Sequence, residues 1–220
     1  MSHPDDPLAS LAQSLTEDFN QHSGDQVQAG IDEREHWLAG VPAVTELALT
    51  RKVRKTLMIY SVFMLALGCG ILGDGKAMLT GAVFLLVGLF LLTGVWLHRH
   101  AGKDVLMRLT HTHLWLRNFK AQLDLQDVTG IQIGDSRIMR ITLTLREGAA
   151  LPGCTNSLGP LTPHVKLKSG RAPQVRLTML GLELNGKTLT PEEVMEMLHT
   201  HCAAARITAE LNMLKARQSA

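Results

Sequence analysis

Two long uncharged segments, separated by only three residues, constrain the fold of this chain more than any other feature. Residues 56–73 and 77–97 contain no Asp, Glu, Lys or Arg, and Asp74-Gly75-Lys76 lies between them. Each segment reaches the length of about 20 residues that crosses a bilayer core of about 30 Å. Because backbone polar groups in lipid must bond within helices, the short link predicts an antiparallel hairpin of two membrane spans.

The residues that flank this hairpin on the side of the chain ends are mostly basic or aromatic: Arg51, Lys52, Arg54, Lys55, Trp96 and Arg99. The turn between the spans carries one Lys and one Asp. The positive-inside bias therefore predicts a multi-pass membrane protein with both termini in the cytoplasm. We expect the basic flanks to attract anionic headgroups as an anchor, without specific lipid recognition.

The spans themselves are more typical of an anchor than of a transport pathway. Neither contains an ionisable Asp, Glu, Lys or Arg, which an ion or proton pathway normally requires. Gly68, Gly70, Gly81 and Gly88 could allow the two helices to approach closely. An ordinary role as small residues of membrane helices explains them equally well.

The remaining chain divides by charge and pattern. Residues 1–50 hold nine of the 20 Asp and Glu but only one of the 22 Lys and Arg, so they predict an acidic, partly helical cytoplasmic arm. The hairpin region is 51–103, a β-rich cytoplasmic domain follows over 104–205, and a helical tail occupies 206–220. The arm could dock a partner, fold back on the basic domain, or remain a mobile leader.

Within the arm, apolar spacing predicts two helices. Leu8, Leu11, Leu15 and Phe19 recur at helical intervals up to a break at Gly24. A second short helix is expected over 25–38. Pro42 suits the first turn of a further helix that would lead through the basic flank into the first span.

After Gly102 the apolar period changes to two, which is typical of strands. Residues 105–110, 113–117, 138–146, 165–168 and 175–179 alternate apolar and polar side chains, with Gly and Pro turn signals between them. This predicts an antiparallel meander of six or seven strands with one buried face. Thr190 and Glu193 then form a capping box that begins a C-terminal helix.

This arrangement resembles the bacterial two-span membrane proteins that carry a pleckstrin-homology-like (PH-like) domain. The resemblance rests on the hairpin followed by VLMRLTHTHLWLRN, LDLQDVTGIQI and IMRITLTLRE, and it covers residues 50–205. It implies a membrane α-helical hairpin plus an α+β domain, in which a small, bent antiparallel sheet or barrel is capped by a C-terminal helix. It also implies a binding or scaffolding module with no catalytic residues to carry over.

Catalytic motifs are not found in the sequence. It contains no phosphate-binding loop, dinucleotide fingerprint, zinc-protease helix or nucleophile elbow. The histidine pairs at 98 and 100, 111 and 113, and 199 and 201 are more typical of interfacial or turn residues than of metal ligands. We therefore expect a protein that is not an enzyme and has no catalytic, cofactor-binding or metal-binding residues.

Exposed side chains of the β domain are the candidates for partner binding. Trp115 and Arg117 alternate onto one side of a strand, and Arg140 and Arg146 are expected on the solvent face of another. Trp and Arg are enriched at interface hot spots. The sequence predicts a scaffold that binds a protein partner, and membrane lipids through the hairpin. A toxin-neutralising immunity protein and a lipid- or ligand-responsive regulator remain alternatives. The basic residues are spread along the chain and not clustered, which disfavours binding of nucleic acid. The sequence does not decide whether the protein forms a homo-oligomer.

Overall fold

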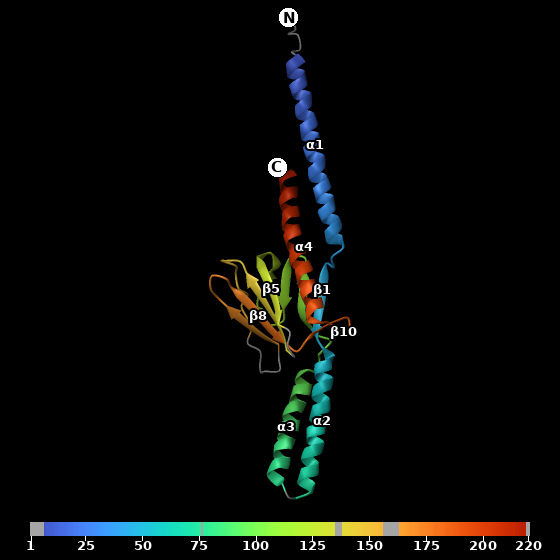
Figure 1. The fold of residues 1–220 in the computed structure, drawn as a ribbon, viewed down its shortest axis with the longest axis vertical. Helices are drawn as coiled ribbons and strands as arrows, with labels where there is room; N and C mark the ends of the chain where they lie inside the picture. The colour runs from blue at the N-terminus through green and yellow to red at the C-terminus, as the bar shows by residue number, and fades with distance from the viewer. Residues whose placement is uncertain (1–6, 76, 135–137, 156–162, 219–220) are drawn as a thin grey trace.

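The computed structural model describes residues 7–75, 77–134, 138–155 and 163–218. Figure 1 shows an elongated molecule with a helical hairpin at one end, a β domain in the middle and a projecting helix at the other end. The hairpin consists of α2 (Arg51–Gly73) and α3 (Met78–Leu97). Both helices are long and apolar enough to cross a membrane. Antiparallel sheets and a C-terminal helix follow, so the class is α+β.

The β domain is built from two antiparallel sheets. The six-stranded sheet has the order β10-β9-β1-β2-β3-β4, and the four-stranded sheet has the order β5-β6-β8-β7. The strand bounds in the first sheet are β1 (Val44–Leu49), β2 (Val105–Thr110), β3 (His113–Leu116), β4 (Leu123–Asp124), β9 (Leu182–Leu184) and β10 (Lys187–Thr188). Those in the second are β5 (Val128–Gly134), β6 (Met139–Leu145), β7 (His164–Lys168) and β8 (Gln174–Met179). A 3-10 turn, η1 (Leu125–Asp127), joins the sheets.

One hydrophobic core lies between the sheets and helix α4 (Pro191–Gln218). Leu47, Leu109, Ile141 and Leu177 have their side chains fully buried there. These residues come from β1, β2, β6 and β8. The predicted alternation of apolar residues is therefore confirmed on β2, β6 and β8, whereas β1 was not expected to be a strand. The single core explains why the two sheets fold as one domain.

The C-terminal helix begins as the sequence predicts. The Glu193 amide donates to Thr190 Oγ1 at 3.2 Å, and the Thr190 amide donates to a Glu193 carboxylate oxygen at 2.9 Å. This reciprocal pair is a capping box. The hydrogen bond from Lys187 lowers the pKa of the Glu193 carboxyl most, and the hydrogen bond from the Thr190 amide lowers it further. From this start α4 buries Val194 and Leu198 against the sheets.

The expected helix at the end of the N-terminal segment is wrong, because residues 44–49 form strand β1. This strand lies inside the six-stranded sheet, paired with β2 on one side and β9 on the other. Residues 1–50 are therefore not separate from the β domain. The helical hairpin occupies the connection between β1 and β2, where Ala48 faces Val105 across the ladder. Only Thr50, which caps α2, separates β1 from the hairpin.

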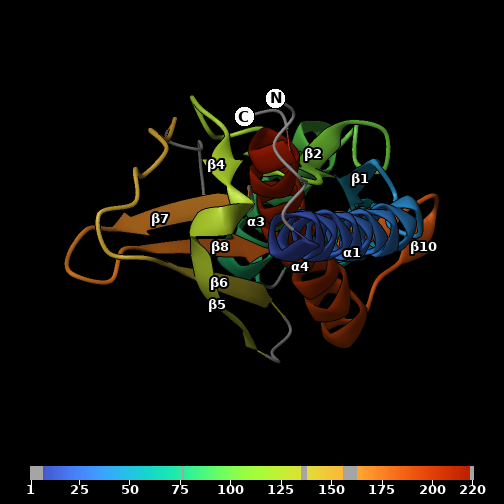
Figure 2. The same cartoon turned by 90° about the horizontal axis from the view of Figure 1, so that it is seen from above.

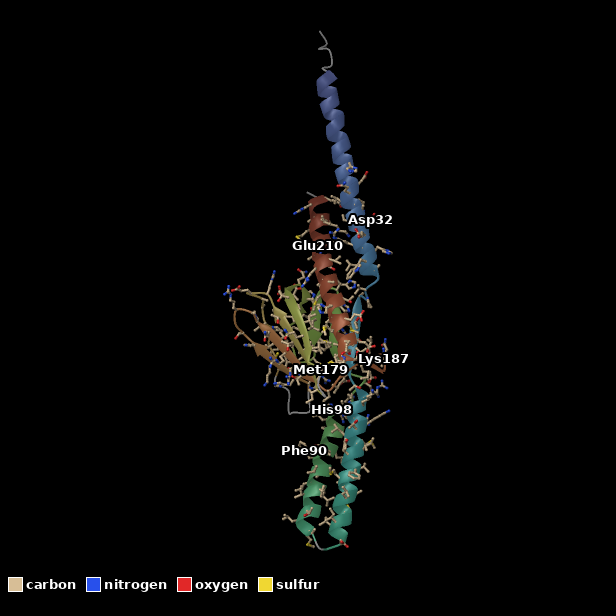
Figure 3. The ribbon with its side chains drawn as sticks, viewed as in Figure 1. Asp32, Phe90, His98, Met179, Lys187 and Glu210 are labelled. Carbon is tan, nitrogen blue, oxygen red and sulfur yellow. The ribbon has the colours of Figure 1, made fainter. Side chains whose placement is uncertain are left out.

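The expected break at Gly24 is also wrong, since α1 (Pro7–Ala39) is continuous. Its C-terminal part packs against α4, where Ile31 and Leu211 are buried. Arg34 pairs with Glu210 at 3.3 Å beside this contact. Figure 3 places Asp32 and Glu210 on the two adjacent helices, and Figure 2 shows α1 running across α4. The acidic arm is thus held on α4, and its N-terminal half projects beyond the C-terminus.

Close backbone contact joins α2 and α3, and glycines permit it. A Cβ on Gly68 would meet the Leu85 backbone nitrogen at 2.9 Å, and Cβ atoms on Gly81 and Gly88 would meet leucine side chains at under 3.0 Å. Ser61 Oγ donates to the Gly88 carbonyl at 3.0 Å. The expected close approach is therefore confirmed at three glycines. Gly70, by contrast, would meet nothing within 4 Å.

Candidate functional site

The four residues selected from the sequence do not form one surface. Trp115 and Arg117 belong to β3 and the turn after it, in the six-stranded sheet. Arg140 lies near the start of β6 in the other sheet, and Arg146 follows its last residue. Six residues of strand separate these two arginines by about 20 Å. The four residues therefore lie on separate parts of the surface of the domain.

Three of the four are engaged within the domain. Trp115 is half-buried and lies opposite Arg108, which in turn pairs with Glu46 at 2.6 Å. Arg117 pairs with Asp104 at 2.9 Å, and Arg146 pairs with Asp127 at 2.6 Å. Exposed pairs of this kind contribute little stability, but they leave less charge available for a partner. Arg140 differs, because it has no ion pair with any described residue.

Arg140 belongs to a cluster of four exposed cations on the four-stranded sheet. We call the solvent side of this sheet around Arg140, Lys166, Lys168 and Arg176 the cationic face. The register sets it: Lys166 lies opposite Arg176, and Arg140 lies opposite Thr178, one pleat from Arg176. Directly paired residues point to the same side of a sheet. The four cations thus occupy three adjacent strands, about 10 Å across.

The cationic face is electrostatically unbalanced. None of its four cations forms an ion pair or hydrogen bond with the part of the chain that the structure describes. The described strands of this sheet carry no Asp or Glu at all. Like charges directly opposite each other, such as Lys166 and Arg176, destabilise a sheet by about 0.2–1 kcal/mol. The fold therefore keeps a charge arrangement that does not stabilise it.

Protection of a sheet edge accounts for only part of this pattern. Strand β7 is an edge of the four-stranded sheet, and lysines on edge strands discourage pairing with other chains. That explanation covers Lys166 and Lys168. Arg140 and Arg176 lie on the interior strands β6 and β8, so edge protection gives no reason for them. The interior arginines are what distinguish this face as a candidate binding surface.

The sequence contains a signal for this face that alternation alone did not reveal. From residue 163 to 179 there is no Asp or Glu, and three of the four Lys or Arg there, Lys166, Lys168 and Arg176, belong to the cationic face. Those cations looked spread along the chain because a turn separates Lys168 from Arg176. The antiparallel pairing of β7 with β8 brings them together.

A cavity of about 420 Å³ lies at the junction of the hairpin and the β domain. Leu49, Leu97 and Leu106 give it apolar walls, and Arg117 and Asp104 contribute their ion pair. Figure 3 shows His98 where α3 meets the domain, and this buried histidine also lines the cavity. Its polar groups are mostly engaged, so the cavity is a weaker candidate than the cationic face.

The six predicted membrane-flanking residues all lie at the end of the hairpin that adjoins the β domain. Arg51 joins the two parts most directly: its amide donates to Glu183 at 3.0 Å and its guanidinium contacts the same buried carboxylate at 3.3 Å. Lys52, Arg54 and Lys55 follow on the first turns of α2, and Trp96 and Arg99 lie at the end of α3. The domain is therefore held firmly on the hairpin.

His201 is the buried histidine with the most complete set of partners. Its Nε2 lies 3.1 Å from Thr45 Oγ1 and its Nδ1 lies 3.1 Å from the Thr110 carbonyl. The carbonyl can only accept, so Nδ1 carries the proton and Nε2 accepts from Thr45. Burial lowers the pKa of His201, and His111 nearby lowers it further, against the raising effect of the Thr110 carbonyl. The ring acts as a neutral link between β1, β2 and α4.

This pKa shift has a measurable consequence for stability. Below pH 6.5 a solvated histidine binds a proton in the unfolded chain, and His201 binds one less readily in the folded protein because burial lowers its pKa, so the free energy of unfolding falls with falling pH. At pH 5.5 the loss from this residue is expected to reach up to about 1.4 kcal/mol. Urea titrations of wild type and His201→Asn at pH 7.5 and 5.5 test this. The variant should show the smaller pH dependence, and parallel losses would contradict the assignment.

The described residues contain no group of three or more His, Cys, Asp or Glu placed to hold a metal ion. Comparison of the chain with family models, with curated proteins and with solved structures finds no match.

Proposed function

We propose that this protein is a non-enzymatic scaffold of the bacterial inner membrane, and that its cationic face binds an acidic surface of a partner protein on the cytoplasmic side. The observation that carries the proposal is the group of four cations without an ion pair among the described residues, two of them on interior strands. The hairpin would hold this surface at a fixed place next to the bilayer, since one residue separates β1 from α2.

The exposure of the hairpin supports its placement in a membrane. Leu79, Met78 and Ile59 leave 69–83% of their surface uncovered, and most side chains of both helices point outward. Exposed apolar surface of this extent is unfavourable in water. Figure 3 shows Phe90 on the outside of the hairpin in the same way. Lipid is the solvent that suits these side chains.

The orientation follows from charge at the two ends of the hairpin. Arg51, Lys52, Arg54 and Arg99 lie at the end that adjoins the β domain, whereas the sequence of the opposite turn has one Lys, Lys76, beside Asp74. The positive-inside bias then places the β domain, α1 and the C-terminus in the cytoplasm.

A PH-like assignment of the β domain is part of the proposal. Two antiparallel sheets around one core, closed by a C-terminal helix, support it. The insertion of the hairpin between β1 and β2 is an addition to the pattern that the sequence suggested. Binding is attributed to the cationic face, since fold likeness alone does not assign function.

An acidic protein fits this face better than nucleic acid. The described neighbours of the cations are Thr142, Thr178, Gln174 and His164, and the described strands of this sheet contain no Phe, Tyr or Trp. Single-stranded nucleic acid is usually held by stacking on aromatic rings as well as by cations. A carboxylate-rich protein surface requires only the cations, which would also accelerate its association.

Reversal of one charge separates binding from stability. Lys166→Glu places a carboxylate opposite Arg176, so the protein is expected to gain about 0.2–1 kcal/mol of stability while it loses the partner. Stability is measured by thermal unfolding of the full-length protein in mild detergent. Partner capture is measured by a photocrosslinker at position 178 in cells and identification of the crosslinked protein.

Lys120→Glu is the matched control, because Lys120 is an exposed lysine outside the cationic face and undergoes the same charge change. It should leave the crosslinked product intact. The proposal fails if Lys166→Glu retains the product, or if both variants lose it equally. A crosslinked protein without an acidic surface would also count against it.

A further inference from the structure

A second cationic feature lies on the hairpin, on the side exposed to lipid. A groove of about 400 Å³ is lined by Arg54 of α2, by Leu89, Leu92, Thr93, Val95 and Trp96 of α3, and by Arg99 just after α3. The part of the groove around Leu89 and Leu92, farther from the β domain, is apolar. The two arginines lie at the end next to the β domain. No Asp or Glu is among the described residues that line it.

The two arginines are held in place. Arg54 Nη1 donates to the Arg99 carbonyl at 3.3 Å, which ties α2 to the end of α3. The Arg99 guanidinium carbon lies 4.9 Å from the centre of the Trp96 ring, and its Nε lies 2.9 Å from His100 Nε2. Stacking on tryptophan orders an arginine side chain and leaves its edge free for an anion. Phosphate oxygens suit such forked donors.

The apolar part of the groove has the length of one membrane leaflet. Ten residues separate Leu89 from Arg99, which corresponds to about 15 Å along a helix. Half of a bilayer core of about 30 Å is the same length. An acyl chain that begins at the level of Arg99 would therefore remain in contact with α3 to the depth of Leu89.

We propose that this groove is a specific site for an anionic glycerophospholipid. The phosphate lies between Arg54 and Arg99, the glycerol backbone lies beside Trp96, and one acyl chain follows Leu92 and Leu89. This inference rests on the proposed placement of the hairpin in a membrane. It goes beyond anchoring, because a diffuse basic flank would attract every anionic headgroup equally through Lys52 and Lys55, whereas the groove holds one lipid.

Native mass spectrometry of the full-length protein in mild detergent tests the proposal, with dioleoyl phosphatidylglycerol and phosphatidylcholine offered in equal amounts. Wild type is expected to retain one phosphatidylglycerol in clear preference. Each cation near an anionic headgroup contributes about a fivefold preference, so Arg54→Gln/Arg99→Gln should lower it about 25-fold. Leu92→Trp, which fills the apolar floor without changing charge, should also displace the lipid.

Lys52→Gln/Lys55→Gln is the matched control, since it removes two charges from the same turns of α2 outside the groove. It should keep the bound lipid. Equal losses in the two double variants, or equal retention of both lipids by wild type, would overturn the proposal. Displacement of phosphatidylglycerol by millimolar inorganic phosphate would show an ion site instead of a lipid site and would also overturn it.

The same samples separate this inference from the proposed function. The Arg54→Gln/Arg99→Gln variant leaves the cationic face unchanged, so its crosslinked partner should persist when the lipid is lost. Recovery of wild type in the soluble fraction of cells would instead remove the membrane placement and, with it, both proposals.

Discussion

Replacement of residues 52–102 by Gly-Asn-Gly is expected to give a soluble, folded β domain. The hairpin connects two neighbouring strands of one sheet, and Ala48 already faces Val105 across the ladder. Packed helices lie about 8–10 Å apart, which three residues can span. Removal of the hairpin also removes the exposed apolar surface of α2 and α3. The domain should then be monomeric in buffer without detergent.

Arg51 is kept in this variant for an electrostatic reason. Glu183 is buried, with only 5% of its side chain exposed, and Arg51 is the partner of its carboxylate through both amide and guanidinium. Removal of one partner of a buried pair leaves an uncompensated charge and is strongly destabilising. A version that begins the replacement at residue 51 should therefore be less stable than one that begins at residue 52.

The matched fragment 104–220 is expected not to fold. It lacks β1, so β2 and β9 lose the strand between them, and the core loses Leu47 and Leu49. Burial of a leucine side chain contributes about 1.5–3 kcal/mol, and a small domain is stable by only about 5–15 kcal/mol. Circular dichroism and amide exchange should show a cooperative structure in the first variant and none in the fragment.

A folded fragment 104–220 would contradict the central position of β1. An aggregated Gly-Asn-Gly variant with intact secondary structure in detergent would show that the hairpin is part of the fold and not an insertion into it. The soluble variant would also allow the cationic face to be studied without a membrane.

The fold could be predicted from the sequence where buried apolar and exposed polar side chains alternate regularly. Residues 138–146 alternate strongly and form β6, and the capping box at Thr190 begins α4. Strand β1 was missed because its inward side combines Thr45, Leu47 and Leu49. Thr45 is buried there by its hydrogen bond to His201, which is 156 residues away in sequence. No local pattern reveals such a contact.

The same limit applies to helix α1 and to the candidate site. Gly24 was expected to end a helix. A glycine within a helix lowers the stability of the helix by only about 1 kcal/mol, so α1 continues past this position. The cationic face required the register that places Lys166 opposite Arg176. The alternation in the sequence indicates which side chains of a strand point to solvent. The order and register of the strands, which the alternation does not reveal, determine which of these side chains lie next to each other.

Gly68→Val is expected to separate the two helices of the hairpin, and Gly70→Val is expected to have little effect. The two glycines are two residues apart on α2, so they point about 200° from each other. A Cβ at position 68 would lie 2.9 Å from the Leu85 backbone nitrogen, which a change of side-chain rotamer cannot relieve. At position 70 nothing lies within 4 Å. Overpacking of this kind costs about 1–3 kcal/mol.

Unfolding of the full-length protein by SDS, followed by the fluorescence of its tryptophans, measures this difference. The Gly68→Val midpoint should fall well below that of wild type, with Gly70→Val close to wild type. Because both variants add the same side chain to the same helix, helix propensity and hydrophobicity are matched between them. Equal midpoints would mean that α2 and α3 do not pack through Gly68. A lower midpoint for Gly68→Val alone would establish that close backbone contact, as well as the short Asp74 turn, holds the hairpin closed.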